Sequence, residues 1–231
     1  MDELINTITI DWDWVAASLA RKERFDSAKD ETVKKALGEF ALKSIEISKN
    51  KAVPGIAIVK KDILSLEPGS IEIEKDIKFM TKELANHLKG ASQIYIYVVT
   101  IGKSIENAAT ECMKSGDPLT GYLLDRTGSF AVESLAKNTE YAIRKALALQ
   151  NLSVSMRFSP GYCDWPIEEQ FKLAKLIDFQ KAGVTLSENC MMIPKKSISA
   201  IVGIGPKELF TKIQSPCTVC NMKVCDYRRK D

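Results

Sequence analysis

The sequence predicts a single α+β domain in which a twisted, mainly antiparallel or mixed sheet is flanked by helices. Strand-like and helical segments both occur throughout the 231 residues, but they do not alternate strictly, which disfavours a doubly wound parallel sheet. Hydrophobic residues make up 45% and charged residues 27%, the composition of a soluble globular protein. At about 150 residues per domain, this length allows one large domain or two small ones, and we find no repeat or linker that divides it.

Charge and composition exclude several functional classes. The net charge of +3 is too small to indicate binding to nucleic acid. The longest apolar run, Ile94–Val99, is far shorter than the ~20 residues that cross a membrane. The first residues are acidic and lack the layout of a secretory signal, so we expect a cytoplasmic protein. The single histidine, His87, leaves no second histidine for a multi-histidine metal site or catalyst.

The first part of the chain is predicted to mix short strands with helices. Short apolar runs rich in isoleucine predict strands at Ile8–Ile10, Ile56–Ile58 and Ile71–Ile73, the last two after Pro-Gly turns. Apolar residues at a spacing of three and four predict helices over Glu31–Ser48 and Lys75–Lys89.

The middle of the chain is predicted to hold a central strand and the longest helix. Ser92–Thr100 is apolar on both faces, as in a strand with neighbours on both sides. A helix follows to Lys114, and the next begins with Asp117 as N-cap and Pro118 in its first turn. That helix extends to about Gln150. Its predicted apolar stripe consists of Leu123, Phe130, Ala131, Leu135, Ala142, Ala146 and Leu149.

The last third is predicted to contain a strand, a loop, a short helix and a final strand, over Leu152–Phe158, Ser159–Trp165, Ile167–Asp178 and Ser197–Ile204. In the predicted long helix that ends near Gln150, Gly128 lowers helix stability by about 1 kcal/mol relative to alanine, unless close packing or a ligand needs the space.

The loop holds the residues with the clearest chemical character. Pro160 and Gly161 predict a turn that leaves backbone N–H and C=O groups available to a ligand. Arg157, just before the turn, has a forked set of donors that suits a carboxylate. Tyr162, just after it, offers a flat apolar ring with a polar tip. The alternative is an ordinary turn with a surface arginine and a packed tyrosine.

The same loop begins a longer pattern. RFSPGY at residues 157–162 is followed by TLSE at 185–188, MMIP at 191–194 and SIS at 197–199. This order and spacing resemble the activation domain of cobalamin-dependent methionine synthase, whose pattern is R-x-[AS]-P-G-Y, L-[ST]-E-S/N, M-x-P and S-[VI]-S. The resemblance implies a C-shaped α+β domain that binds S-adenosylmethionine and assists the reductive methylation of cobalamin.

The resemblance also implies roles for individual residues. Arg157 matches the family's arginine at the ligand carboxylate, and Ser159 matches a position with main-chain contacts to the ligand. Gly161 and Tyr162 match the turn and the residue beside the region of methyl transfer. Glu133, in the long helix, aligns with an acidic residue near the positive end of the ligand; the alternative is a solvated helix residue.

Asp11 resembles an aspartate that meets the amino group of the ligand in this family; the alternative is a helix cap. A carboxylate near a sulfonium favours binding because their charges are opposite. The sequence departs from the family after Ser199, because the pair of tyrosines that contacts the ligand there is missing from residues 200–206. The chain also lacks a cobalamin-binding D-x-H-x-x-G sequence, so it resembles a stand-alone relative that acts on a corrinoid protein supplied in trans.

The last residues form a separate feature. Cys217, Cys220 and Cys225 make a C-x2-C-x4-C pattern, and Cys163 is our preferred fourth ligand, with Cys190, Cys112 or an outside group as alternatives. The pattern fits a structural zinc ion, an iron–sulfur cluster, a redox dithiol, or reduced cysteines without a ligand. We therefore divide the chain into an activation-type domain at residues 1–210 and a cysteine-containing tail at 211–231.

Three functions are consistent with these features. The first is an S-adenosylmethionine-binding module for the reactivation of a corrinoid, with a corrinoid- or cobalamin-binding protein or a methyltransferase as partner and a flavodoxin- or ferredoxin-type electron donor. The second is a docking module for a corrinoid protein or methyltransferase that binds no ligand, which the missing tyrosine pair favours. The third is a metal-dependent redox protein that uses the cysteines of the tail.

Overall fold

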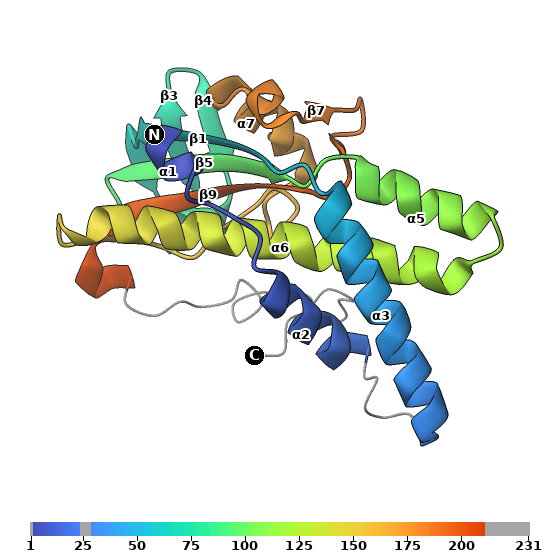
Figure 1. The fold of residues 1–231 in the computed structure, drawn as a ribbon. Coiled ribbons are helices and arrows are strands. Elements are labelled where there is room, and N and C mark those ends of the chain that lie inside the picture. The colour runs from blue at the N-terminus through green and yellow to red at the C-terminus, as the bar shows by residue number, and fades with distance from the viewer. Residues whose placement is uncertain (1, 24–28, 211–231) are drawn as a thin grey trace.

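The computed structural model describes residues 2–23 and 29–210, which form the mixed α+β fold drawn in Figure 1. The predicted cysteine tail, including Cys217, Cys220 and Cys225, lies outside the described residues. Among the described residues, no helix is both long and apolar enough to cross a membrane.

The main sheet has four antiparallel strands in the order β1-β5-β9-β6. These strands are β1 (Gly55–Asp62), β5 (Gln93–Thr100), β9 (Ser197–Pro206) and β6 (Leu152–Val154). The prediction of a central strand is confirmed, because β5 pairs with β1 on one side and β9 on the other along its whole length.

The remaining strands form two smaller antiparallel sheets. One is the meander β2 (Ser65–Glu67), β3 (Ser70–Glu74) and β4 (Ile77–Met80), and the other pairs β7 (Thr185–Leu186) with β8 (Met192–Ile193). The predicted antiparallel α+β class is therefore confirmed.

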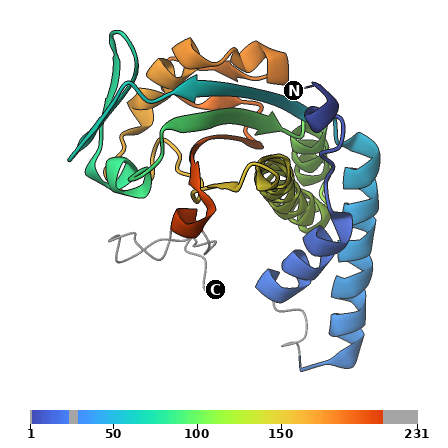
Figure 2. The same ribbon diagram turned by 90° about the vertical axis from the view of Figure 1, so that its left-hand side faces the viewer.

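Helices lie on both faces of the main sheet. The long helix α6 (Pro118–Ala148) runs across one face, and α7 (Gln170–Leu176) lies on the other, as both views show (Figures 1 and 2). The helices packed around α6 are α2 (Trp12–Glu23), α3 (Glu31–Lys51) and α5 (Ser104–Lys114). The remaining short helices are α1 (Asp2–Ile5), α4 (Lys82–His87), and the 3₁₀ turns η2 (Ile167–Glu169), η3 (Phe179–Ala182) and η4 (Lys207–Phe210).

Each face of the sheet has its own hydrophobic core. Because side chains alternate along a strand, Ile96 and Val98 of β5 pack with Trp165 and Leu173 on the α7 side. Tyr97 and Val99 pack with the apolar stripe of α6 on the opposite side. The sheet is thus buried on both faces, which explains why β5 is apolar throughout.

Two of the predicted elements are wrong. Ile8–Ile10 forms no strand; its backbone lies along α6, where Asn138 Nδ2 donates to the Thr9 carbonyl at 2.7 Å. The helix predicted over Lys75–Lys89 begins only at Lys82, because residues 77–80 form β4 with a buried–exposed alternation. Thr81 caps the helix by accepting the Leu84 N–H at 3.2 Å.

Two further boundaries differ from prediction. The predicted stripe of α6 drifts at its end: Leu149 is 98% exposed, and Ile143 and Leu147 are buried instead. The strand expected to reach Phe158 ends at Val154. Its ladder is interrupted because the Ser155 side-chain oxygen, rather than a main-chain carbonyl, accepts the Gly203 N–H at 2.9 Å.

Candidate functional site

The loop predicted to bind a ligand begins beside the centre of the main sheet. Phe158 and Ile201 of β9 exchange two backbone hydrogen bonds of 2.9 Å, so the residue after Arg157 is fixed to a central strand. The chain then turns at Gly161, whose φ of +92° lies in the left-handed region that favours glycine. The predicted turn is therefore present.

The backbone of this turn is less available than predicted. The Gly161 N–H donates to the Trp165 carbonyl at 2.7 Å, the Tyr162 N–H to the Ser159 carbonyl at 3.0 Å, and the Trp165 N–H to the Tyr162 carbonyl at 2.9 Å. These hydrogen bonds make the loop a compact unit, because three of its N–H groups are satisfied internally.

Aromatic contacts hold the loop against the core. The ring of Phe158 stacks on Trp165 with centroids 6.2 Å apart, and Tyr162 meets Phe158 edge to face at 6.0 Å. The ring of His87 packs on Phe158 at 5.0 Å, and its Nδ1 is 2.7 Å from the Glu83 carbonyl. The tyrosine is half-buried, with one side of its ring supported by the core.

Asp164, also in the loop, fixes the start of α4. Its carboxylate accepts hydrogen bonds from the Thr81 hydroxyl and the Lys82 N–H, both at 2.7 Å. Burial raises the pKa of Asp164, but these hydrogen bonds and one from the Glu83 N–H outweigh it, so the pKa lies below its ordinary value. The loop is thereby joined to a segment about eighty residues earlier.

Arg157 is buried, with only 4% of its surface exposed, and it faces two carboxylates of α6. Its Nη2 pairs with Glu133, and its Nη1 lies 3.2 Å from Glu140 Oε1. Glu133 and Glu140 are two turns apart on one face of the helix. Tyr97, from β5, donates its hydroxyl to the same Glu140 oxygen at 3.0 Å. The predicted residues Arg157 and Glu133 are thus in direct contact.

The electrostatics of this cluster keep the arginine charged. Burial lowers the pKa of Arg157, but Glu133, Tyr97 and Glu140 more than offset it and hold the pKa well above its usual range. Burial raises the pKa of Glu140, against the opposing influence of Arg157 and the Tyr97 hydroxyl. One guanidinium between two carboxylates gives a site that favours a further positive charge, such as an ammonium or sulfonium.

Three buried polar atoms in and beside the loop have no hydrogen-bond partner among the described residues. They are Arg157 Nε, Ser159 Oγ and Trp165 Nε1, and all three residues are more than nine-tenths buried. An unsatisfied buried donor or hydroxyl costs about 1–3 kcal/mol. Such atoms at a turn with this charge pattern are typical of a place where a ligand supplies the missing partner.

Asp11 caps helix α2 and also lies beside α6. Its Oδ1 accepts the Trp14 N–H at 2.9 Å, as the side chain of a helix cap does. Its backbone N–H donates to Ser134 Oγ at 2.9 Å, and Ser134 is the neighbour of Glu133. The structure therefore brings Asp11 next to the helix that carries both carboxylates, although its own carboxylate is used by the cap.

The remaining predicted ligands do not form a metal site in the described part of the chain. Cys163 is half-buried in the loop with a φ of 51°, Cys190 is buried, and Cys112 is half-buried in α5. No group of three or more His, Cys, Asp or Glu side chains in residues 2–23 and 29–210 is arranged to hold a metal ion. The three cysteines of the tail lie outside those residues.

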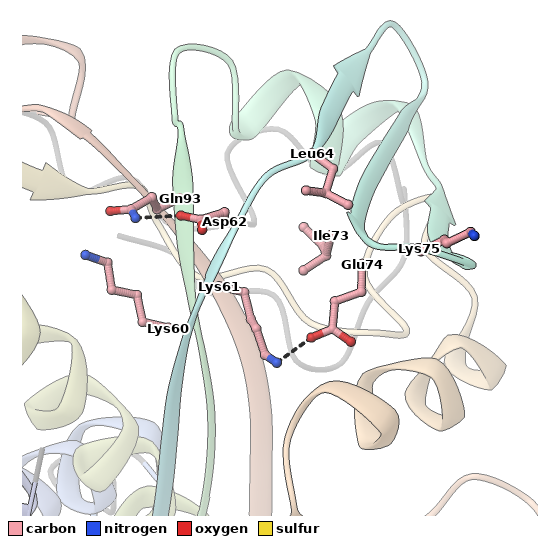
Figure 3. A pocket seen from close by; sticks show the side chains of 8 residues that line it. All are labelled: Lys60, Lys61, Asp62, Leu64, Ile73, Glu74, Lys75 and Gln93. Atoms are coloured by element: carbon pink, nitrogen blue, oxygen red, sulfur yellow. Dashed lines mark hydrogen bonds and ion pairs between the residues drawn. The ribbon is translucent and has the colours of Figure 1, made fainter.

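A cleft of about 480 Å³ opens elsewhere, between β1 and the β3 strand (Figure 3). Two pairs of its lining residues contact each other: Lys61 pairs with Glu74, and Gln93 donates to Asp62 at 2.7 Å. No predicted site residue lines this cleft, so it does not extend the Arg157 site.

Sequence reasoning missed Glu140 and Tyr97. Glu140 could have been found, because it lies seven residues after Glu133 and thus on the same face of a predicted helix. Tyr97 carries no comparable signal, because its position depends on how the sheet packs against α6.

Comparison with known proteins agrees with the loop pattern. The family model described as vitamin B12-dependent methionine synthase, activation domain, matches residues 79–230, which is more than half of the chain. The chain belongs to this family. The matched region contains Arg157, Glu133 and every other predicted site residue except Asp11.

The fold of this activation-domain family member also matches a solved structure. The structure described as the MetH reactivation domain bound to AdoHcy superimposes with a TM-score of 0.62 at 17% identity, covering 90% of this chain and 76% of that one. At this identity, the likeness establishes the common fold. No curated protein matches the chain.

Proposed function

We propose that this activation-domain protein binds S-adenosylmethionine between the loop at 157–162 and α6, and supports the reductive methylation of cobalamin. The observation that carries the proposal is the buried Arg157 at the start of the R-x-S-P-G-Y turn, held between two carboxylates of α6. Family membership and the AdoHcy bound to the structurally similar reactivation domain support it.

The residues present fit this ligand. Arg157 would bind the ligand carboxylate, which requires that carboxylate to share or replace one of the two glutamates now on its guanidinium. Glu133 would then lie near the positive end of the ligand, where its charge favours a sulfonium. Ser159 and Gly161 would line the turn, and the half-buried Tyr162 would lie beside the methyl group. The unsatisfied Arg157 Nε and Ser159 Oγ would gain partners.

The reaction that we propose takes place between this ligand and a cobalamin-binding module. Cobalamin on the partner would supply the methyl acceptor once an electron from a flavodoxin- or ferredoxin-type donor had reduced it, and S-adenosylmethionine would supply the methyl group and be left as S-adenosylhomocysteine. The contribution of this chain is to bind and orient the methyl donor. We propose further that it acts in trans on a separate corrinoid protein or methyltransferase.

Titration calorimetry with S-adenosylmethionine tests the binding site. We expect wild-type protein to bind, and Arg157→Lys, which keeps the charge but loses the fork, to bind at least about tenfold more weakly. The matched control is Arg126→Lys, because Arg126 of α6 also pairs with a carboxylate, that of Glu23 in α2, at 2.8 Å. The proposal would be contradicted if wild-type protein gave no heat of binding and no thermal shift at millimolar ligand.

A docking module without a ligand is the second candidate, favoured by one specific observation. Both terminal nitrogens of Arg157 already contact carboxylates of the protein itself. In this case the cluster is purely structural, and the protein would bind a corrinoid protein with or without S-adenosylmethionine. Co-sedimentation with the corrinoid partner, repeated with and without the nucleotide, separates the two candidates.

For the tail, we propose that Cys217, Cys220 and Cys225 bind zinc or an iron–sulfur cluster, with Cys163 as fourth ligand. Metal analysis and a visible spectrum of anaerobically purified protein test this. A colourless protein without zinc would contradict both metals. Cys163→Ser is expected to lower the metal content if the loop and tail share the site.

A further inference from the structure

Glu140 and Tyr97 form a support behind the arginine of the proposed ligand site. Two groups donate to the same carboxylate oxygen, Glu140 Oε1. The Tyr97 hydroxyl donates to it at 3.0 Å, and Arg157 Nη1 donates to it at 3.2 Å. Three different segments, β5, α6 and the loop, meet at this one carboxylate oxygen. The tyrosine is completely buried, so its hydroxyl has a fixed position.

The two glutamates on Arg157 differ in their surroundings. The Glu140 side chain is 16% exposed, whereas that of Glu133 is 29% exposed. Glu140 is also held by the Tyr97 hydroxyl, and Arg144, one turn further along α6, adds an attractive charge. A ligand carboxylate that reaches Arg157 from solvent therefore meets the Glu133 side of the guanidinium more readily than the Glu140 side.

We propose that Glu140, oriented by the Tyr97 hydroxyl, is a positioning residue that holds the Arg157 guanidinium in place while the ligand carboxylate replaces Glu133 on it. The inference rests on the proposed function. A guanidinium fixed on one edge presents its other edge at low entropic cost, so the support contributes to affinity without touching the ligand. The Glu140 carboxylate also compensates the buried positive charge of Arg157 when Glu133 moves away.

A double-mutant cycle tests whether Glu140 acts through Arg157. The affinity for S-adenosylhomocysteine is measured by calorimetry on wild type, Glu140→Gln, Arg157→Lys and the double variant. We expect Glu140→Gln to weaken binding about tenfold in the wild-type background and less than about twofold when Arg157 is already lysine. Equal effects in both backgrounds, or no effect in either, would overturn the inference.

A gentler variant and a matched control complete the design. Tyr97→Phe removes only one hydroxyl, so it can replace Glu140→Gln in the cycle if that variant does not fold. We expect Tyr97→Phe to weaken binding of S-adenosylhomocysteine about threefold, and to have no such effect when Arg157 is already lysine. Glu23 provides the control. Its carboxylate accepts hydrogen bonds from Tyr122 at 2.7 Å and from Arg126 at 2.8 Å, which is the same combination of glutamate, tyrosine and arginine as at Glu140. Glu23→Gln is expected to leave affinity unchanged.

The outcomes distinguish the inference from the function on which it rests. If wild type does not bind S-adenosylhomocysteine or S-adenosylmethionine, the proposed function is wrong and the inference falls with it. If wild type binds but Glu140→Gln and Tyr97→Phe bind equally well, only the inference is wrong. If Glu23→Gln weakens binding as much as Glu140→Gln, the effect is general destabilisation, which also overturns it.

Discussion

Arg157 lies inside the protein with a positive charge, and the two glutamates of α6 make this possible. A buried charge that loses its partner is costly, whereas a buried pair and well-packed apolar residues are often similar in stability. The arginine is therefore a structural residue as well as our proposed ligand contact, and each of its variants changes both properties.

Arg157→Ala is expected to lower the free energy of unfolding by about 3–5 kcal/mol, because it leaves two partly buried carboxylates without the positive charge that they share. Urea denaturation measures this. Adding Glu133→Gln and Glu140→Gln to the same variant should recover part of the loss, since the uncompensated charges disappear. A loss below about 1 kcal/mol, the value of an exposed pair, would mean that the cluster is solvated.

Asp164 predicts a pH dependence of stability. Its pKa in the folded state is lowered from the ordinary 3.8, so its contribution is fully present above that value and is lost as the pH falls through the folded pKa. Asp164→Asn should cost about 1 kcal/mol at neutral pH, as the loss of a helix-capping carboxylate does. In urea titrations the difference from wild type should shrink below pH 3.8; a difference that persists there would contradict the assignment.

At the scale of single residues, the sequence predicts the loop and not its support. Arg157 and Gly161 carry local signals, because a forked donor before a Pro-Gly turn is recognisable without any other part of the chain. Glu140 and Tyr97 become relevant only when the sheet packs on α6, and no local pattern contains that information.

The helices show a similar division between local and distant causes. The start of α6 was predicted correctly because Asp117 accepts the Thr120 N–H at 3.1 Å and Pro118 occupies the first turn, both of which are local. The strand β4 was missed because residues 77–80 match a helical pattern as well, and pairing with β3 decides between the two. Gly128 proves to be a close contact, since an added Cβ would lie 3.3 Å from Ile105.

Two other helical glycines give a matched test of this packing. In α3, an added Cβ at Gly38 meets nothing within 4 Å, so Gly38→Ala should raise the free energy of unfolding by about 1 kcal/mol through helix propensity. In α6, a Cβ at Gly121 would lie 2.8 Å from the Ala109 carbonyl oxygen, so Gly121→Ala should lower stability by about 1–3 kcal/mol. Thermal unfolding measures both, and a stabilising Gly121→Ala would show that α5 and α6 are less close.

The whole molecule is organised around a sheet with one core on each face. Ile201 belongs to the core on the α7 side, and Ile204, on the same strand, belongs to the core on the α6 side. Residues 157 and 158 lie beside this strand, so Arg157 contacts the glutamates of α6 while Phe158 packs into the core on the α7 side. The sequence predicts this two-sided burial through the apolar β5, but it does not indicate which helix covers which face.

Ile201→Val and Ile204→Val test whether the two cores unfold together. Each should cost about 0.5–1.5 kcal/mol, because each removes one buried methylene-sized group. If the domain is cooperative, both variants shift the midpoint of one transition seen by circular dichroism and by tryptophan fluorescence. Two separate transitions, each sensitive to one variant, would show that the faces behave as independent units.

The bridge between Phe158 and Ile201 has a consequence for how binding energy is distributed. Because the turn is hydrogen-bonded to a central strand, it cannot open by itself without disturbing the ladder that both cores share. Any molecule held by the turn would then be linked to the folding equilibrium of the domain as a whole, and its occupancy would appear as resistance to global unfolding. Because of the same hydrogen bonds, a substitution that loosens the packing of either core also destabilises the turn.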